Sequence, residues 1–429
     1  MIDIKLLRES PELVKANIKK KFQNDKLALV DEVLKLDEKW RKLKFDEDKL
    51  RSERNSVSKE VSEAKKAKNE KKANEALKRA KKIPEEIAET EEKRKVLEEQ
   101  IKLIIYKIPN IMHDSVPLGK NETENKEIKK IGTPKVPDYE IFNHAELAEK
   151  LEGVDFDSAR EISGNGFYFL RGDLARLHSA LLAFARDYMI DQGFEYVIPP
   201  FLIRKKVAEG VMSFAEMDNM MYKVEGEDLY LIGTSEHSMI GRFVDKTLLG
   251  KQLPITLTSY SPCFRKEVGA HGMEEKGLYR LHQFEKQEMI VICEPEDSYT
   301  WYDKMTNFTV DVFKQLDIPV RILECCSGDL ADLKAKSCDV EAWSPRQKKY
   351  FEVGSCSNLT DAQARRLNIR IENKGKTYFA HTLNNTVLAS PRAIIALMEN
   401  NQNKDGSINI PKVLQPYMGG KKKIEVKKK

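Results

Sequence analysis

The chain has no hydrophobic run long enough to cross a membrane. No apolar stretch approaches the roughly 18 residues that a spanning helix needs. Its first residues, MIDIKLLRESPELV, also lack the basic start and apolar core of a secretory signal. We therefore expect no membrane contact and a cytoplasmic location.

Cysteine is scarce, and its spacing excludes a common class of metal site. The six cysteines among 429 residues include no C-x-x-C pair, the usual spacing of a structural zinc site. No convincing Ser/His/Asp set is present either, so nothing indicates a protein nucleophile. We expect reduced thiols, mostly in the core.

Charge, by contrast, is abundant. Charged residues make up 33% of the chain and the net charge is only +5, so the distribution of charge matters more than its sum. The length allows two or three domains, and Pro109, Pro117 and Gly119 punctuate a polar stretch between two of them. The predicted divisions are an arm (1–110), a larger domain (111–420) and a basic, disordered tail (421–429).

Residues 26–104 have the spacing of two long helices. Apolar residues recur every seven positions at Leu36, Leu43, Leu50, Val57 and Ala64, and the seam resumes from Ala73 with spacings of three and four. Glu47 and Arg94 are among the residues that interrupt it. Such seams are typical of coiled coils. A polar break near residues 68–72 therefore predicts an antiparallel hairpin about 60 Å long at about 1.5 Å per residue.

The tip of this hairpin is strongly basic. Its cations are Lys65, Lys66, Lys68, Lys71, Lys72, Lys78, Arg79, Lys81 and Lys82. A solvated helical face is one explanation for such a run. RNA binding is the other, because phosphate contacts release counterions and hold the backbone without regard to sequence.

Residues 263–288, CFRKEVGAHGMEEKGLYRLHQFEKQE, form the stretch around which the larger domain is organised. Strands are predicted over 257–264 and 279–292, with a mobile, glycine-rich loop between them that contains Gly269, His271, Gly272 and Gly277. Residues two apart share a face of a strand. Arg265 and Glu267 share a face of the first strand, and Arg280, His282, Phe284, Lys286 and Glu288 share a face of the second. If the two sets face the same way, the hairpin gathers them onto one surface.

This face combines residue types suited to a nucleotide. Arginine is a planar cation that fits phosphate, and an aromatic ring can stack on a base. A salt-bridged surface hairpin would show a similar pattern.

Three other segments carry candidate chemistry, each with a plainer structural explanation. Gly233-Thr234-Ser235-Glu236 could hold a cationic ligand or cap a helix. Glu352, in FEVGSCSN, could ligate magnesium or be a solvated carboxylate. Residues 382–392, TLNNTVLASPR, could be an ordinary strand-to-helix junction.

FRKE followed by GLYRLHQFEKQE closely resembles motif 2 of class II aminoacyl-tRNA synthetases, in the non-zinc form of the seryl-tRNA synthetases. Residues 193–203, GFEYVIPPFLI, resemble motif 1, and 382–392 resemble motif 3. The resemblance implies an α+β fold: an antiparallel-sheet class II catalytic domain preceded by the long helical hairpin. It implies ATP-dependent activation of L-serine with Mg²⁺, transfer to serine tRNA, and a homodimer.

The resemblance also implies roles for individual residues. The catalytic residues are Arg265, Glu352 and Arg392. Serine binds at Thr234, Ser235, Glu236, Glu288 and Thr386. ATP binds at Arg265, Lys266, Glu267, Phe284, Glu352, Val353, Gly354, Ser355 and Arg392. Magnesium binds at Glu352 and Ser355. The long variable arm of the tRNA binds at Lys65, Lys66, Lys68, Lys71, Lys72, Lys78 and Arg79.

Four residues depart from what the pattern leads one to expect. Ser235 replaces a usual alanine, Gly354 a common serine and Asn385 a usual glycine, while Pro84 lies inside a predicted helix. Two other functions stay open from the sequence: a ligase that loads serine or another small amino acid onto a different acceptor, and a non-catalytic RNA-binding homologue. The combined presence of Arg265, Glu288, Glu352 and Arg392 argues against the second.

Overall fold

The computed structural model describes residues 1–267 and 277–427. The chain divides into two compact units, Ile2–Pro109 and Asn110–Lys429 together with Met1. Gly269, His271 and Gly272, which belong to the predicted loop, lie outside the described residues.

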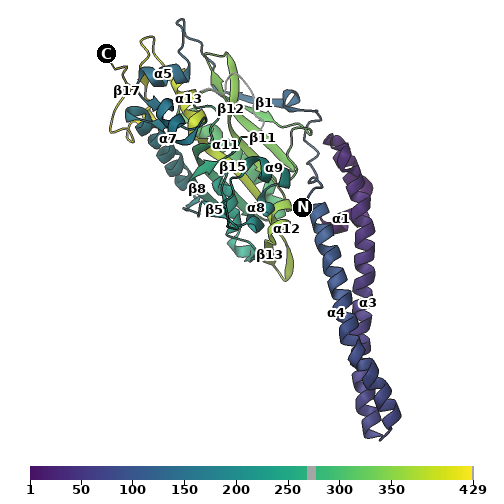
Figure 1. Ribbon diagram of the computed structural model, residues 1–429. Helices are drawn as coiled ribbons and strands as arrows, with labels where there is room; N and C mark the ends of the chain where they lie inside the picture. The colour runs from purple at the N-terminus through teal and green to yellow at the C-terminus, as the bar shows by residue number, and fades with distance from the viewer. Residues whose placement is uncertain (268–276, 428–429) are drawn as a thin grey trace. The chain divides into compact units, whose positions relative to one another are not determined.

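The N-terminal unit is built on two long helices. Its elements are α1 (Ile4–Glu9), α2 (Pro11–Lys20), α3 (Leu27–Lys66) and α4 (Glu70–Ile105). The last two lie side by side (Figure 1). With 40 and 36 residues, they span about 60 and 54 Å at about 1.5 Å per residue. Val57, Ile83 and Ile87 pack between them, and Asn69 caps α4 by accepting a hydrogen bond from the Lys72 amide at 3.1 Å.

The polar interruptions of the seam meet each other across this hairpin. The guanidinium of Arg94 donates to the Glu47 carboxylate at 2.8 Å, and Arg51 donates to it at 2.7 Å. Glu47 is only 1% exposed. Burial opposes its ionisation, but the bonds from Arg94 and Arg51 outweigh this and lower its pKa. The α4 helix continues through Pro84, which is exposed.

An eight-stranded sheet organises the C-terminal unit, in the order β1-β10-β11-β12-β15-β9-β8-β4. Neighbouring strands are antiparallel except β4 and β8. The strands are β1 (Lys126–Ile131), β4 (Glu195–Tyr196), β8 (Ile255–Phe264), β9 (Gln283–Cys293), β10 (Val320–Glu324), β11 (Lys336–Ser344), β12 (Lys349–Asn358) and β15 (His381–Ala389).

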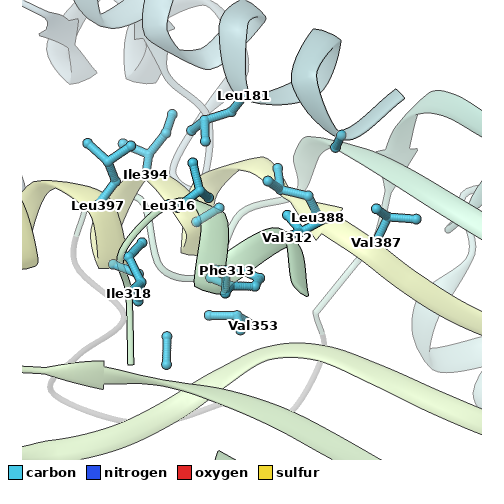
Figure 2. Close-up of a cluster of buried hydrophobic side chains, with 14 of the residues drawn as sticks. Leu181, Val312, Phe313, Leu316, Ile318, Val353, Val387, Leu388, Ile394 and Leu397 are labelled. Atoms are coloured by element: carbon cyan, nitrogen blue, oxygen red, sulfur yellow. The ribbon is translucent and has the colours of Figure 1, made fainter. Parts of the chain in front are cut away.

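Both faces of this sheet are covered by helices. On one face lie α7 (Gly172–Asp191), α11 (Ser298–Gln315) and α13 (Ser390–Asn401); on the other lie α8 (Lys205–Val211), α9 (Phe214–Met220), α10 (Ser235–Gly241) and α12 (Ala362–Leu367). Alternate residues of β9 serve the two cores: Met289 and Val291 the first, Ile290 and Ile292 the second. Figure 2 shows part of the first core, where Phe313 and Leu316 lie near Ile394 and Leu397.

The remaining elements are short. They are α5 (His144–Lys150), α6 (Phe156–Ser163), β2 (Val154–Asp155), β3 (Phe169–Leu170), β5 (Leu202–Ile203), β6 (Tyr230–Leu231), β7 (Thr247–Leu249), β13 (Arg370–Asn373), β14 (Lys376–Phe379), β16 (Ile408–Asn409) and β17 (Lys423–Ile424). Within the described ranges, no helix combines the length and the apolar character that crossing a bilayer requires.

Two sequence predictions need correction here. The second hairpin strand begins at Gln283 rather than at residue 279, because the His282 amide bonds to the Gly166 carbonyl at 2.9 Å, outside the sheet. The tail is ordered over 421–427. Ile424 is 2% exposed in the core, and Lys427 pairs with Glu152 at 2.7 Å.

Candidate active site

A cleft of about 460 Å³ opens on the sheet face that α8, α9, α10 and α12 cover. Strands β9, β12 and β15 line it, as do the residues that follow β8. The predicted site residues that line it are Thr234, Glu236, Arg265, Glu267, Phe284, Glu288, Glu352, Val353, Gly354, Ser355, Thr386 and Arg392. Segments more than 150 residues apart in the sequence thus meet in one cavity.

The hairpin of β8 and β9 presents one side to this cleft. Phe284, Lys286 and Glu288 alternate along β9 toward it. Arg265 follows β8, and its Nε donates to the Gly233 carbonyl at 3.1 Å. The Arg265 guanidinium carbon lies 5.3 Å from the centre of the Phe284 ring. A cation and an aromatic ring therefore stand together, as an adenine nucleotide would require.

The other charged pair of the hairpin closes the same side. Arg280 donates to the Glu267 carboxylate at 2.8 Å, and both residues line the cleft. His282 lies elsewhere: its Nδ1 is 3.0 Å from the Arg265 carbonyl, and its ring lies beside Phe167.

A chain of polar contacts runs across one end of the cleft. The Thr234 hydroxyl donates to the Glu288 carboxylate at 3.1 Å. Lys286 forms an ion pair with that carboxylate, and its Nζ donates to the Thr386 hydroxyl at 3.3 Å. Thr234 also caps α10 by accepting the Glu236 amide, so the helix-cap and ligand-binding interpretations of this threonine are compatible.

The side chain of Glu236 ionises at a higher pH than an ordinary glutamate. Burial first, and then the nearby charge of Glu288, raise its pKa to about 7. Gln363 donates to Glu236 at 3.1 Å, and its own carbonyl accepts from the Thr382 hydroxyl at 2.8 Å. Because the side-chain oxygen of Gln363 accepts the hydrogen bond from Thr382, it is the side-chain nitrogen of Gln363 that faces the Glu236 carboxylate. Burial, Arg265 and Lys286 lower the pKa of the adjacent His237 to about 3, which keeps it neutral.

The cleft also contains a second arginine, Arg392. Arg392 donates to the Glu352 carboxylate at 2.8 Å and to its backbone carbonyl at 3.1 Å. Partial desolvation in the cleft opposes ionisation of Glu352, whose side chain is still 42% exposed, but Arg392 outweighs this and lowers the pKa of Glu352. The Arg392 guanidinium carbon lies 5.0 Å from the centre of the Tyr279 ring.

Two oxygen-bearing side chains on β12 could hold a metal. Glu352 and Ser355 both line the cleft, and the Ser355 hydroxyl bonds to Asp339, whose pKa is raised to about 7 by burial and by Glu352. In residues 1–267 and 277–427, no group of three or more His, Cys, Asp or Glu residues is placed to bind an ion.

Two predicted residues do not line the cleft. Ser235 begins α10 and is fully buried, with its hydroxyl 3.5 Å from the Ser259 carbonyl. Lys266 extends its amine toward the Asp218 carbonyl at 3.4 Å. The motif spacing did not show which of these neighbours face the cavity.

The departures at Gly354 and Asn385 are explained by packing against α11. Asn385 lies within β15, opposite Met289 and away from the cleft. It donates to the Met305 carbonyl at 2.6 Å and to the Thr309 hydroxyl at 2.9 Å. A Cβ at Gly354 would lie 3.1 Å from the Thr386 carbonyl and 3.2 Å from the Thr309 methyl, so glycine fits this crowded position.

Several residues that the prediction of site residues omitted belong to the cleft or support it, and four of them carry polar groups relevant to the site. Lys286, Asn384 and Tyr279 line the cavity, and Gln363 bonds to Glu236. Strand alternation did place Lys286 on the hairpin face, although without a role, and it could have found Asn384, which lies two residues from Thr386. Gln363 lies on α12 and carried no sequence signal.

At the tip of the arm, six of the predicted tRNA-binding cations are exposed. They are Lys65, Lys66, Lys68, Lys71, Lys72 and Lys78. Arg79 is different. It bonds to Glu53 at 2.5 and 2.8 Å and to Glu86 at 2.7 Å, so its charge already joins the two helices.

Two family models match this chain. The seryl-tRNA synthetase N-terminal domain matches residues 1–112, and the tRNA synthetase class II core domain (G, H, P, S and T) matches residues 221–401. A serine–tRNA ligase of Methanoculleus marisnigri is 43% identical over 98% of this chain and 99% of its own length. One of Thermococcus sibiricus is 42% identical over 100% and 99%.

Solved structures agree with these matches. Seryl-tRNA synthetase from Pyrococcus horikoshii, crystallised with ATP, superposes with a TM-score of 0.94 at 41% identity and covers 100% of both chains. The cytoplasmic serine–tRNA ligase of Naegleria fowleri, in complex with AMP, gives a TM-score of 0.88 at 35% identity, covering 100% of this chain and 99% of that one.

Proposed function

The chain belongs to the seryl-tRNA synthetase family, and from this premise we propose that its cleft activates L-serine with ATP and passes the serine to the 3′ end of serine tRNA. One observation carries the proposal: two arginines and an aromatic ring share the cavity with a polar end that includes Thr234, Glu236 and Glu288. In the reaction, a serine carboxylate oxygen forms a bond to the α-phosphorus of ATP, and pyrophosphate leaves. The tRNA hydroxyl then displaces AMP from the adenylate.

The arginines and the phenylalanine bind and orient ATP in this proposal. Arg265 holds the α-phosphate, where negative charge develops in the transition state. Phe284 stacks on adenine, and Glu267 accepts from its amino group. Arg392 holds the γ-phosphate, for which it exchanges its 2.8 Å bond to Glu352. Positioning and charge stabilisation suffice, since the attacking group is the substrate's own carboxylate.

Serine is selected by paired polar groups. Glu288 and Thr386 bond to its hydroxyl, and Thr234 and Glu236 hold its ammonium group. Alanine would leave buried polar groups without partners and is therefore strongly rejected. Threonine must be excluded by shape, because one extra methyl group is otherwise worth only about 1–3 kcal/mol.

Glu352 and Ser355 are suited to Mg²⁺ that arrives with ATP. Magnesium commonly takes one or two protein oxygens and completes its shell with phosphates and water. Both side chains are oxygen donors in the cleft, and the Glu352 side chain is 42% exposed. With Mg²⁺ held there, Glu352 and Ser355 would place a positive charge that neutralises phosphate charge.

The helical arm serves as the tRNA-binding domain in this proposal. Residues 1–110 form it, and residues 111–420 form the catalytic domain. The exposed lysines at its tip bind the long variable arm of the tRNA through phosphate contacts. Arg79 contributes mainly to the stability of the arm, since its guanidinium group already forms ion pairs with Glu53 and Glu86.

A homodimer is proposed from the apolar surface around motif 1. Ile198 is 74% exposed and Leu202 40%, and Val197, Pro199 and Met239 line a groove beside them. A second copy would cover such a patch. We place the reaction in the cytoplasm, where tRNA is charged for protein synthesis.

ATP–pyrophosphate exchange with each of the twenty amino acids tests the activation step. Exchange that depends on serine alone is expected, and Arg265→Ala should abolish it. Exchange with another amino acid would contradict the proposed specificity. A complete absence of exchange would leave a non-catalytic RNA-binding protein as the explanation, and exchange without tRNA charging would favour a different acceptor.

A further inference from the structure

Four polar side chains form a cluster on the sheet face opposite the cleft. The Tyr168 hydroxyl donates to Oε2 of Glu285 at 2.8 Å. Nε2 of His178 lies 3.0 Å from the same oxygen and 2.8 Å from the hydroxyl of Ser390. Ser390 is fully buried, and the side chains of His178 and Glu285 are 13% and 17% exposed. We call these four residues the His178 cluster.

The contacts fix where the histidine carries a proton. Glu285 is ionised, because the bonds from His178 and Tyr168 lower its pKa although burial opposes this. A carboxylate only accepts hydrogen bonds, so Nε2 of His178 must hold hydrogen. The Ser390 oxygen is then a second acceptor of the same N–H. One histidine thus binds two different elements at once.

Those two elements carry the proposed ATP-binding side chains. Glu285 follows Phe284 in β9, and successive residues of a strand point to opposite faces. Ser390 begins α13, two residues before Arg392. His178 lies on α7, a helix whose apolar residues belong to the core that supports both. Its hydrogen bonds therefore connect the backbone behind the adenine platform to the helix turn that carries the phosphate-binding arginine.

We propose that His178 is a positioning residue for ATP, which sets the spacing between Phe284 and Arg392 through Glu285 and Ser390. The inference rests on the proposed function, since it takes these two side chains as the ends of the nucleotide site. Serine binds through Thr234, Glu236, Glu288 and Thr386, none of which belongs to the cluster. Loss of His178 should thus weaken ATP binding more than serine binding.

His178→Ala and His178→Gln test this in the full-length protein. Glutamine keeps an N–H donor near the position of Nε2, whereas alanine removes it. Ser179→Ala is the matched control, because Ser179 is the next residue of α7 and its hydroxyl bonds locally within that helix, to the Ala175 carbonyl at 3.2 Å. The measurements are the Kd of ATP by calorimetry and the KM values for ATP and serine in pyrophosphate exchange, with rates normalised to adenylate-forming sites.

For His178→Ala we expect an increase of about tenfold in the Kd and KM for ATP, with less than about threefold in the KM for serine. His178→Gln should stay within about threefold of wild type for ATP, and Ser179→Ala should match wild type. Unchanged ATP binding in a folded His178→Ala protein would overturn the inference. So would equal losses for both substrates, or a lower melting temperature as the sole effect.

Two further variants keep the test decisive if His178→Ala does not fold. Ser390→Ala and Glu285→Gln each remove one side of the connection and should each raise the Kd of ATP; normal ATP binding in both would refute the role. A wild-type protein that binds ATP but shows no pyrophosphate exchange with any amino acid would contradict the proposed function. The Kd of ATP for wild type and for His178→Ala would still test the role of His178 in that case.

Discussion

At the scale of single residues, charge decides what the polar end of the cleft can bind. Glu236 must be ionised to attract an ammonium group, yet burial and Glu288 raise its pKa to about 7. Between its ordinary value of 4.5 and about 7, the folded protein holds this proton more tightly than the unfolded chain. This carboxyl therefore makes the free energy of unfolding fall as pH rises through that window.

The KM for serine should consequently depend on pH. As pH falls from about 8 to about 6, Glu236 becomes protonated, and the KM should rise about tenfold at saturating ATP. Pyrophosphate exchange across this range measures the effect. Glu236→Gln should show a high KM with little pH dependence. A variant that keeps the wild-type profile would show that another group titrates.

Crowding behind the serine end gives a second prediction at this scale. Gly354→Ser should destabilise the fold by about 1–3 kcal/mol and raise the KM for serine, because the new Cβ would press on the Thr386 carbonyl and the Thr309 methyl. Adding Thr309→Ser removes that methyl but keeps the hydroxyl that donates to the Thr386 carbonyl at 2.7 Å. Chemical unfolding should then show partial recovery. A Gly354→Ser variant as stable as wild type would contradict this explanation.

Individual side chains show how far sequence reasoning reaches in the site. Strand alternation places Phe284 and Glu288 on one face, and the structure brings both to the cleft. It could not place Ser235, because the first turn of α10 directs this side chain into the core. Nor could it find Gln363, whose role depends on the packing of α12 near Glu236.

At the scale of elements, the arm depends on a buried ion pair within a coiled coil. The heptad spacing predicted both long helices and the break between them, and the structure confirms the helical hairpin. The spacing treated Glu47 and Arg94 as separate interruptions. Glu47 and Arg94 are 47 residues apart, and they pair because of the register between the two helices. The apolar periodicity of each helix does not determine that register.

Removal of one partner of this pair should therefore be costly. Glu47→Ala is expected to lower the free energy of unfolding by about 3–5 kcal/mol, since it leaves Arg94 without its buried carboxylate. Glu47→Leu combined with Arg94→Leu should restore or exceed wild-type stability. Denaturant unfolding followed by circular dichroism measures both.

Glu89→Ala is the control, because Glu89 belongs to an exposed pair with Lys93 and its removal should leave the free energy of unfolding almost unchanged. Because the pKa of Glu47 is lowered on folding, its contribution holds above pH 4.5 and is lost as pH falls through the folded value. Equal losses from Glu47→Ala and Glu89→Ala would refute the buried-pair explanation.

At the scale of the whole molecule, the class II architecture was predicted from the resemblance of motifs 1 to 3 to those of class II synthetases, and local patterns alone did not give it. The α+β fold with its antiparallel sheet is confirmed. The prediction that the basic tail is disordered was wrong. It rested on the many lysines of the tail and overlooked one apolar residue, Ile424, which enters the core. Composition alone could not show that β16 would pair with it.

For a dimer that forms through the motif 1 surface, we predict that the arm of one subunit serves the site of the other. Ile198→Asp should then give a monomer in analytical ultracentrifugation, because a charge would be buried at the interface. A heterodimer of one armless subunit and one Arg265→Ala subunit retains one intact arm and one intact site on different chains. This heterodimer should charge tRNA. An inactive heterodimer would contradict the prediction that the arm of one subunit binds tRNA for the active site of the other.

Charging of serine tRNA tests the central claim most directly. The purified protein is incubated with ATP, serine tRNA and each labelled amino acid in turn, beside a variant in which Lys65, Lys66, Lys68, Lys71, Lys72 and Lys78 are glutamine. The account predicts that wild type attaches serine alone to the tRNA 3′ end. The glutamine variant should keep pyrophosphate exchange while its KM for tRNA rises and loses salt dependence. Attachment of a different amino acid, or exchange with no charging of serine tRNA, would contradict it.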